Sequence, residues 1–273
     1  MADHDLRTFL SRLERNGQLR RVSAPVDPDL ESTALCLRAL REDGPALLME
    51  HATGSRHPLL GNLFGHRDRI EAALDGRPLA SLRELGELLA AIREPRWPAN
   101  LRQALSSWPE LAQLAHVAPR RVHEAAFNDE VLGPGEIDLA RLPIQRCWPG
   151  DAGRLITLGL VITRGTRKPR QNIGIYRMQV IGPDRVIMRW LPHRGGALDY
   201  ADFRASHPDK PFPVLVAIGV DPCTTLAAVS PGWITPSTSI SAPAGASSPV
   251  RSLCHTRVRS PRSRPAPRYW SKA

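Results

Sequence analysis

Long apolar runs are absent from the sequence. No stretch of about 18 apolar residues occurs, so we expect no transmembrane helix. The opening residues, Met1 to Asp5, lack a basic segment followed by an apolar one, so we expect no secretory signal. The four cysteines are widely spaced and form no CxxC pair, which favours free thiols over a cysteine zinc site. We therefore expect a cytoplasmic protein with reduced cysteines.

Common catalytic motifs are also missing. Neither GxGxxG nor a phosphate-loop GKS/T is present, which argues against the usual dinucleotide and nucleotide sites. No GxSxG elbow occurs, so an esterase-type nucleophile has no support.

Acidic residues are absent from the last part of the chain. Residues 230–273 contain six arginines, one lysine and no Asp or Glu. The net charge of the chain is +10, but without these seven basic residues 30 basic and 27 acidic residues remain. A nearly balanced body gives no reason to expect nucleic-acid binding. The tail also holds ten serines and seven prolines without an amphipathic period, which predicts disorder.

The rest of the chain has the pattern of a globular α+β protein. Its length and its 42% hydrophobic content suffice for one large domain or two smaller ones. Leu6, Phe9, Leu10 and Leu13 recur at helical spacing behind a possible cap at Asp5. Periodicity and turn residues predict helices at 6–13, 29–41, 67–74, 81–93 and 100–116, with strands at 19–26, 45–50 and 57–64. Residues 1–116 are thus predicted to form a mixed α/β domain.

The pattern changes after residue 116. Short strands are expected at 121–127, 156–163, 172–181, 185–191 and 213–219, with one helix at 197–206. Gly182-Pro183-Asp184 predicts a hairpin between two of them. Strands at this spacing favour a barrel over a doubly wound sheet.

Residues 171–196 carry the polar groups of greatest interest. Asn172 offers a carbonyl oxygen for a hard cation such as Mg²⁺ or Mn²⁺, or alternatively satisfies a strand edge. Arg177 could bind a phosphate or carboxylate through its fork, or simply be solvated. In His193-Arg194-Gly195-Gly196 the glycines let the backbone approach a ligand closely, and the imidazole and the guanidinium offer a metal ligand and an anion partner. A plain Gly-Gly turn before a helix explains the same four residues equally well.

Together these segments resemble the UbiD family of prenylated-FMN-dependent decarboxylases. The resemblance is carried by residues 171–177, 187–191 and 193–200, and it extends to Ile144-Gln-Arg-Cys-Trp-Pro149, Ile156-Thr-Leu-Gly-Leu160 and Gly44-Pro-Ala-Leu-Leu48. It reaches Asp221-Pro222 and ends near Val229, so it covers about 229 residues. It implies a carboxy-lyase that removes CO₂ from 4-hydroxy-3-polyprenylbenzoate in ubiquinone biosynthesis.

The resemblance also implies roles for individual residues. Asn172 and His193 match the positions that ligate a divalent metal, typically Mn²⁺, which bridges to the phosphate of prenylated FMN. Arg177 matches the catalytic arginine that positions the substrate carboxylate. The positions that match the cofactor-binding runs are Ile175, Tyr176, Arg177, Arg189, Trp190, Leu191, Arg194 and Gly195.

The implied fold is an N-terminal mixed α/β domain at 1–116 followed by an incomplete flavin-reductase-like split β-barrel at 117–229. A disordered basic tail follows at 230–273. The implied partners are an aromatic carboxylic acid, a flavin prenyltransferase that supplies the cofactor, and further copies in a homo-oligomer. The lipid-like substrate also implies peripheral membrane association. No nucleic acid is expected.

The chain departs from the family pattern after Val229. Thr238 stands where the family has the Glu that serves as the third metal ligand, and the acidic proton donor and oligomerisation domain would lie beyond residue 273. We therefore expect little or no activity from this chain alone. The tail is interpreted as an out-of-frame translation that starts near Ser230. The alternatives are a non-catalytic protein whose basic tail binds RNA or anions, and an ordinary FMN-binding split barrel without a metal.

Overall fold

The computed structural model describes residues 5–76, 78–81, 136–167 and 171–229, together with residues 83, 86, 87 and 132. The expected helix at 100–116, the strand at 121–127 and the tail lie outside these residues, and the expected helix at 81–93 lies mostly outside them. Within the described part, no helix is both long and apolar enough to cross a membrane.

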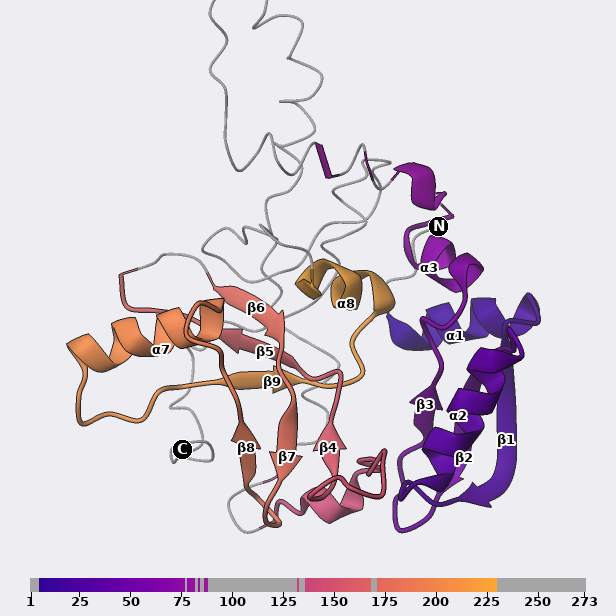
Figure 1. Ribbon diagram of the computed structural model, residues 1–273, viewed down its shortest axis with the longest axis horizontal. Coiled ribbons are helices and arrows are strands. Elements are labelled where there is room, and N and C mark those ends of the chain that lie inside the picture. Colours follow the sequence, from indigo (N-terminus) through magenta and orange to yellow (C-terminus); the bar gives the residue numbers. More distant parts are fainter. Residues whose placement is uncertain are drawn as a thin grey trace, which may run out of the picture.

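The N-terminal unit, residues 5–76, is a small sheet with helices (Figure 1). Its elements are α1 (Leu6–Arg15), β1 (Leu19–Val26), α2 (Glu31–Arg41), β2 (Ala46–Ala52), β3 (Leu59–Gly61) and α3 (Arg67–Ala73). The turn η1 (Leu79–Ser81) follows. β1 runs parallel to β2 through the α2 crossover, and β3 adds to β2 in the antiparallel sense.

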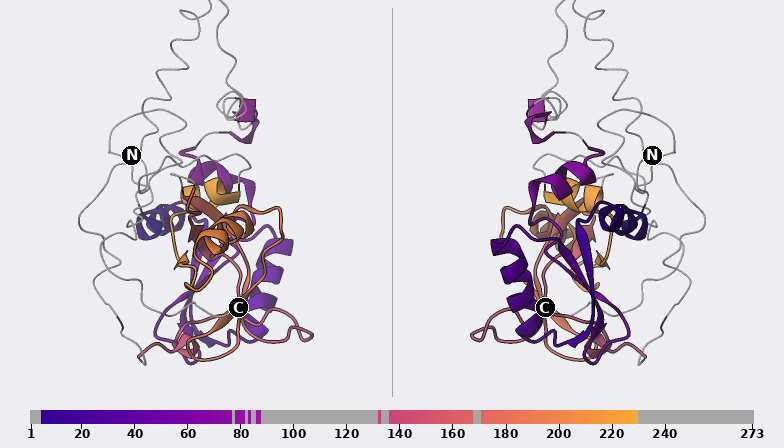
Figure 2. Two further views of the ribbon diagram at one scale, coloured as in Figure 1. Left: turned by 90° about the vertical axis from the view of Figure 1, so that its left-hand side faces the viewer. Right: turned by 90° about the vertical axis from the view of Figure 1, so that its right-hand side faces the viewer.

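Helices α1 and α2 cover opposite faces of this sheet, as the right-hand view of Figure 2 shows. Ala46 and Leu48 of β2 pack with the α1 side, whereas Leu47 and Met49 pack with the α2 side. Successive side chains of a strand point to opposite faces, so a strand covered on both sides must be apolar throughout. The run Pro45-Ala-Leu-Leu-Met meets this requirement.

The expected boundaries of the first helices hold with one correction. Asp5 caps α1, because its Oδ1 accepts a hydrogen bond from the backbone N–H of Thr8 at 2.7 Å. Helix α2 was expected from residue 29 but begins at Glu31. Leu30 adopts a positive φ of 67°, and its N–H donates to the carbonyl of Arg146 at 2.9 Å. This contact with the second half of the chain displaces the start of the helix.

The strand-rich unit, residues 136–229, contains two three-stranded antiparallel sheets. One has the order β4 (Leu155–Ile156), β7 (Met178–Val180), β8 (Val186–Met188), and the other β6 (Asn172–Ile175), β5 (Leu160–Thr163), β9 (Leu215–Ala217). The turn η3 (Leu139–Arg141) precedes them. Val161 and Met178, one from each sheet, are fully buried in a shared core. The described residues form an α+β fold without a closed barrel.

Two strands expected as continuous are each divided between the sheets. The segment 156–163 breaks at 157–159, and the segment 172–181 breaks at Tyr176 and Arg177. At the first break, a Cβ on Gly159 would lie 2.5 Å from the end of the Met178 side chain, so a larger residue there would require Met178 to move. Arg177 therefore lies between two strands rather than on one. The predicted hairpin at residues 182–184 is confirmed by the pairing of β7 with β8.

Helix α7 (Gly195–Ser206) lies against β5 and β6, and α8 (Pro222–Val229) connects the two units (Figure 1). The Asp202 carboxylate of α7 accepts hydrogen bonds from Thr166 Oγ1 and from the backbone and side chain of Arg167. These bonds, those from Arg167 foremost, lower the pKa of Asp202 from 3.8 to about 2. Cys223 and Ala227 of α8 pack with Leu74 of the N-terminal unit.

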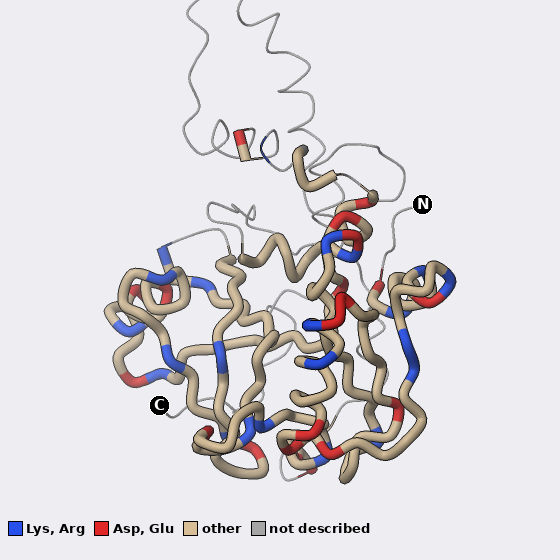
Figure 3. The backbone as a smooth tube through the Cα atoms, turned by 45° about the vertical axis from the view of Figure 1, so that its right-hand side comes forward, with Lys and Arg blue, Asp and Glu red and all other residues tan. Residues whose placement is uncertain are grey.

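Charged residues of both signs intermingle along the described backbone (Figure 3). This distribution agrees with the nearly balanced charge of the body expected from the sequence.

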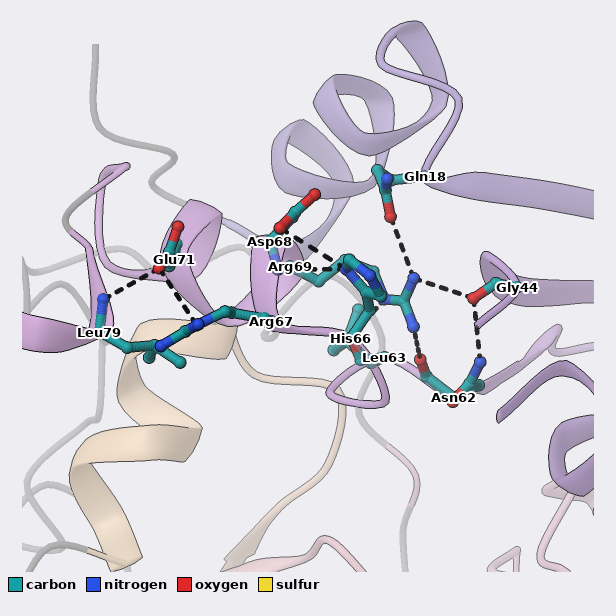
Figure 4. Close-up of polar contacts among 10 residues, drawn as sticks. All are labelled: Gln18, Gly44, Asn62, Leu63, His66, Arg67, Asp68, Arg69, Glu71 and Leu79. Atoms are coloured by element: carbon teal, nitrogen blue, oxygen red, sulfur yellow. Dashed lines mark hydrogen bonds and ion pairs between the residues drawn. The ribbon is translucent and has the colours of Figure 1, made fainter. Parts of the chain in front are cut away.

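The most buried charged group of the N-terminal unit is Arg69, whose side chain is 0% exposed. Its guanidinium donates to the carbonyls of Leu63, Gly44 and Asn62 at 3.0–3.1 Å. A fourth bond goes to Gln18 Oε1 at 3.1 Å (Figure 4). Burial lowers the pKa of Arg69 below its ordinary value. These four hydrogen bonds satisfy carbonyl oxygens from three separate loops, which joins those loops at one point.

We predict that Arg69→Ala destabilises the protein by about 2–4 kcal/mol, because several part-buried carbonyls lose their donor. The matched control is Arg67→Ala on the same helix. Arg67 is 69% exposed and its Nε lies 3.7 Å from Glu71, so its loss is expected to cost less than about 1 kcal/mol. Urea unfolding of both variants checks this, and equal losses would contradict the structural role given to Arg69.

Candidate functional site

The β7–β8 hairpin brings two arginines of the sequence-predicted site face to face. Met178 pairs with Met188, so the next positions in this antiparallel register are Arg177 and Arg189, and then Tyr176 and Trp190. The rings of Tyr176 and Trp190 do meet edge to face, with centroids 6.1 Å apart. The ring contact agrees with this register, and extending the register by one pair beyond the assigned strands sets Arg177 opposite Arg189.

Both arginines are exposed, as is Arg194 at the start of α7. Within the described part of the chain none of the three has an ion-pair partner. Like charges directly opposite each other on a sheet are destabilising, and a bound anion would offset that repulsion. Guanidinium forks suit phosphate and carboxylate oxygens.

The first turn of α7 lies against β6 without space for a Cβ. A Cβ on Gly195 would overlap Asn172 Oδ1, and one on Gly196 would lie 3.1 Å from the indole of Trp190. The backbone N–H of Gly196 donates to the hydroxyl of Tyr176 at 3.1 Å. The close approach at these glycines is to the protein's own strand, whereas from the sequence we expected them to let the backbone approach a ligand.

Asn172 lies half-buried at the start of β6, opposite Thr163 of β5. Its Nδ2 donates to Thr163 Oγ1 at 3.2 Å, and its Oδ1 is turned toward Gly195. His193 is exposed and precedes Gly195 by two residues. An amide oxygen and an imidazole nitrogen suit a divalent ion such as Mn²⁺. Among the described residues no group of three or more His, Cys, Asp or Glu side chains could hold a metal.

An aromatic cluster supports the strand end that carries Arg189. Trp190 contacts Phe212 and Tyr200 at centroid distances of 5.9 and 6.0 Å. Phe212 is buried, whereas Leu191 next to Trp190 is 40% exposed. The cluster fixes the direction in which the chain leaves β8. In this structure Trp190 packs within the aromatic cluster.

The structure therefore brings some of the expected site residues together and leaves others pointing into solvent. Asn172, Tyr176, Trp190 and Gly195 contact one another or the same turn. Ile175 is half-buried opposite Leu160 on β5. The exposed side chains are those of Arg177, Arg189, Leu191, His193 and Arg194.

Three polar residues behind this site were not singled out from the sequence. Thr163 and Asp199 are 2% and 1% exposed, and Thr163 Oγ1 donates to Asp199 Oδ2 at 2.8 Å. Asp202 follows one helical turn later. The sequence did contain a signal for two of them. Asp199 and Asp202 are three residues apart in the expected helix 197–206, which places both carboxylates on one face of that helix.

Two family models match the sequence. The N-terminal domain of 3-octaprenyl-4-hydroxybenzoate carboxy-lyase (UbiD) matches residues 10–89, and its Rift-related domain matches residues 120–245. The two matches cover both structural units.

Solved structures agree with these matches. The UbiD-class enzyme HmfF from Pelotomaculum thermopropionicum in complex with FMN is 32% identical, with a TM-score of 0.65 over 82% of this chain and 44% of that one. An evolved dimeric form of HmfF in complex with prFMN is 30% identical, with a TM-score of 0.63 over 83% and 46%. Vanillic acid decarboxylase from Sedimentibacter hydroxybenzoicus is 26% identical, with a TM-score of 0.66 over 85% and 46%.

The chain therefore spans less than half the length of these three solved relatives. Over that span both the sequence models and the fold agree, and the chain belongs to the UbiD family.

Proposed function

We propose that this chain forms the cofactor-phosphate and metal part of a decarboxylase site that uses prenylated FMN. The observation that carries the proposal is the facing pair Arg177 and Arg189, adjacent to the turn that holds Asn172. The similar HmfF structures contain FMN or prFMN, and another similar enzyme acts on vanillic acid. Together these support a carboxy-lyase acting on an aromatic acid.

Each residue has a role that follows from its chemistry. Arg189 and Arg194 bind the dianionic phosphate of the flavin through charge-assisted hydrogen bonds. Asn172 and His193 hold the divalent metal, which we take to be Mn²⁺. Arg177 holds the substrate carboxylate, and Tyr176 and Trp190 keep the two strand ends in register. The bound cofactor supplies the electron sink that makes loss of CO₂ feasible.

The proposal extends to the substrate, the source of the cofactor and the domain arrangement. The proposed substrate is 4-hydroxy-3-polyprenylbenzoate of ubiquinone biosynthesis, and a flavin prenyltransferase supplies the cofactor. The two antiparallel sheets around Val161 and Met178 represent part of a split barrel within residues 117–229, and residues 1–116 form the N-terminal domain. The lipid-like substrate brings the working protein to a membrane surface. The resemblance to the family further implies that the working protein is a homo-oligomer.

The phosphate-binding role predicts a selective loss of FMN affinity. Arg189→Ala should weaken FMN binding at least about tenfold, since a hydrogen bond to a charged group is worth about 1.5–3 kcal/mol. Riboflavin has no phosphate, so its affinity should stay unchanged. Flavin fluorescence titrations of the purified chain measure both.

Arg185→Ala is the matched control for this experiment. Arg185 precedes β8 on the same hairpin, is 71% exposed and lies next to Asp184. Its removal lowers the net charge by the same amount without touching the proposed site. An equal loss of FMN affinity in this variant, or equal losses of FMN and riboflavin affinity in Arg189→Ala, would overturn the assignment.

The decarboxylase role itself predicts slow CO₂ release from 4-hydroxy-3-polyprenylbenzoate by the chain loaded with prenylated FMN and Mn²⁺. Release should disappear in Arg177→Met, which keeps an unbranched side chain but has no guanidinium to hold a carboxylate. Radiolabelled CO₂ measured with protein in excess provides the readout. Release that persists without Arg177 would contradict its proposed role, and turnover as fast as that of a full-length family member would contradict the expected loss of activity.

A further inference from the structure

A chain of three polar side chains connects α7 to Asn172. Asp199 Oδ2 accepts from Thr163 Oγ1 at 2.8 Å, and Thr163 Oγ1 accepts from Asn172 Nδ2 at 3.2 Å. Asp199 and Thr163 are almost completely buried, whereas Asn172 is half-buried at the proposed site. The chain therefore begins inside the protein and ends at the metal-binding group.

The direction of these hydrogen bonds is set by chemistry. The Thr163 hydroxyl has one hydrogen, and it donates that hydrogen to the carboxylate oxygen Oδ2 of Asp199. That hydroxyl can then only accept from Asn172, which requires the amide nitrogen on that side. The amide oxygen is consequently directed to the other side, toward Gly195. An Asn with the opposite orientation would direct an NH₂ group at a cation.

The carboxylate that sets this direction lies in a closely packed turn. Asp199 and Asp202 lie one turn apart on α7 and both face Gly165, where a Cβ would be 3.3 Å from Asp199 Oδ1 and 2.6 Å from Asp202 Oδ2. Asp202 in addition bonds to Thr166 and Arg167 of the loop that follows β5. Only Asp199 of the two reaches Thr163 and, through it, Asn172.

We propose that Asp199 and Thr163 are positioning residues that fix the Asn172 amide with its oxygen toward the metal. This inference rests on the proposed function, because it assigns a purpose to the orientation of a proposed metal ligand. Hydrogen-bond partners behind a metal ligand commonly change metal affinity by about 10–100-fold when they are removed. Here the partner determines which atom of the ligand is presented.

Asp199→Asn provides a nearly isosteric test. The new amide can donate to Thr163 Oγ1, which frees the hydroxyl hydrogen to donate to Asn172 Oδ1. Because this new amide can either donate or accept, the Asn172 amide is no longer held in one orientation and can present NH₂ to the metal. Asp202→Asn is the matched control, because it makes the same substitution on the same helix face without a link to Asn172.

The measurement is the dissociation constant of FMN with and without Mn²⁺, together with bound Mn²⁺ counted by electron paramagnetic resonance. In the natural sequence Mn²⁺ should tighten FMN binding. In Asp199→Asn this enhancement should fall at least about tenfold while FMN affinity without metal is unchanged. Asp202→Asn should keep the enhancement. Thr163→Val should behave as Asp199→Asn does, and Thr163→Ser should restore the enhancement.

The possible outcomes distinguish a failure of the proposed metal site from a failure of the positioning role. If Mn²⁺ has no effect on FMN binding to the natural sequence, the metal part of the proposed function fails and this inference fails with it. If Mn²⁺ acts there and equally in Asp199→Asn, the positioning role alone is refuted. Equal losses in Asp199→Asn and Asp202→Asn, or loss of FMN affinity without metal, would show that α7 is merely structural here.

Discussion

The close approach of the first turn of α7 to β6 is the constraint on which the site depends. Asn172 occupies the space that a side chain at Gly195 would need, and the indole of Trp190 does the same at Gly196. Tyr176 closes the contact by accepting a hydrogen bond from the Gly196 N–H. A metal-ligand candidate, two aromatic rings and a helix end are thereby held in one place by backbone geometry.

The rest of the structure fixes the position of the contact between α7 and β6. The two sheets of the strand-rich unit share one core. The strands on both sides of the break at Tyr176 and Arg177 are therefore anchored in that core. Helix α8 packs with Leu74 of the N-terminal unit, and the ion pair between Arg146 and Asp29 at 2.8 Å makes a second connection. The site is thus supported from both halves of the described chain.

Local features of the fold could be predicted from sequence, because local rules determine them. The Asp5 cap of α1, the apolar β2 and the β7–β8 hairpin all follow from neighbouring residues. The strand break at Tyr176 could not be predicted, because hydrophobic alternation does not reveal when a strand moves to another sheet. The link between Thr163 and Asp199 joins residues 36 positions apart and depends on tertiary packing.

The candidate site was predicted from sequence in a similarly uneven way. Resemblance to the family named Asn172, Arg177, Arg189 and His193, whereas the residue patterns alone left Asn172, Arg177 and the segment at His193 with ordinary alternatives. The opposition of Arg177 and Arg189 follows from the hairpin register once the centre of the turn is known. What sequence could not supply was the orientation of the Asn172 amide, which depends on buried groups behind it.

The central claim is that Asn172 and His193 hold a divalent metal beside a flavin phosphate bound by the facing arginines. Crystals grown with FMN and Mn²⁺, and measured at the manganese absorption edge, test this most directly. The account predicts an anomalous peak in contact with Asn172 Oδ1 and His193, with the phosphate next to Arg189. A peak elsewhere, or a flavin phosphate bound away from both Arg177 and Arg189, would contradict it.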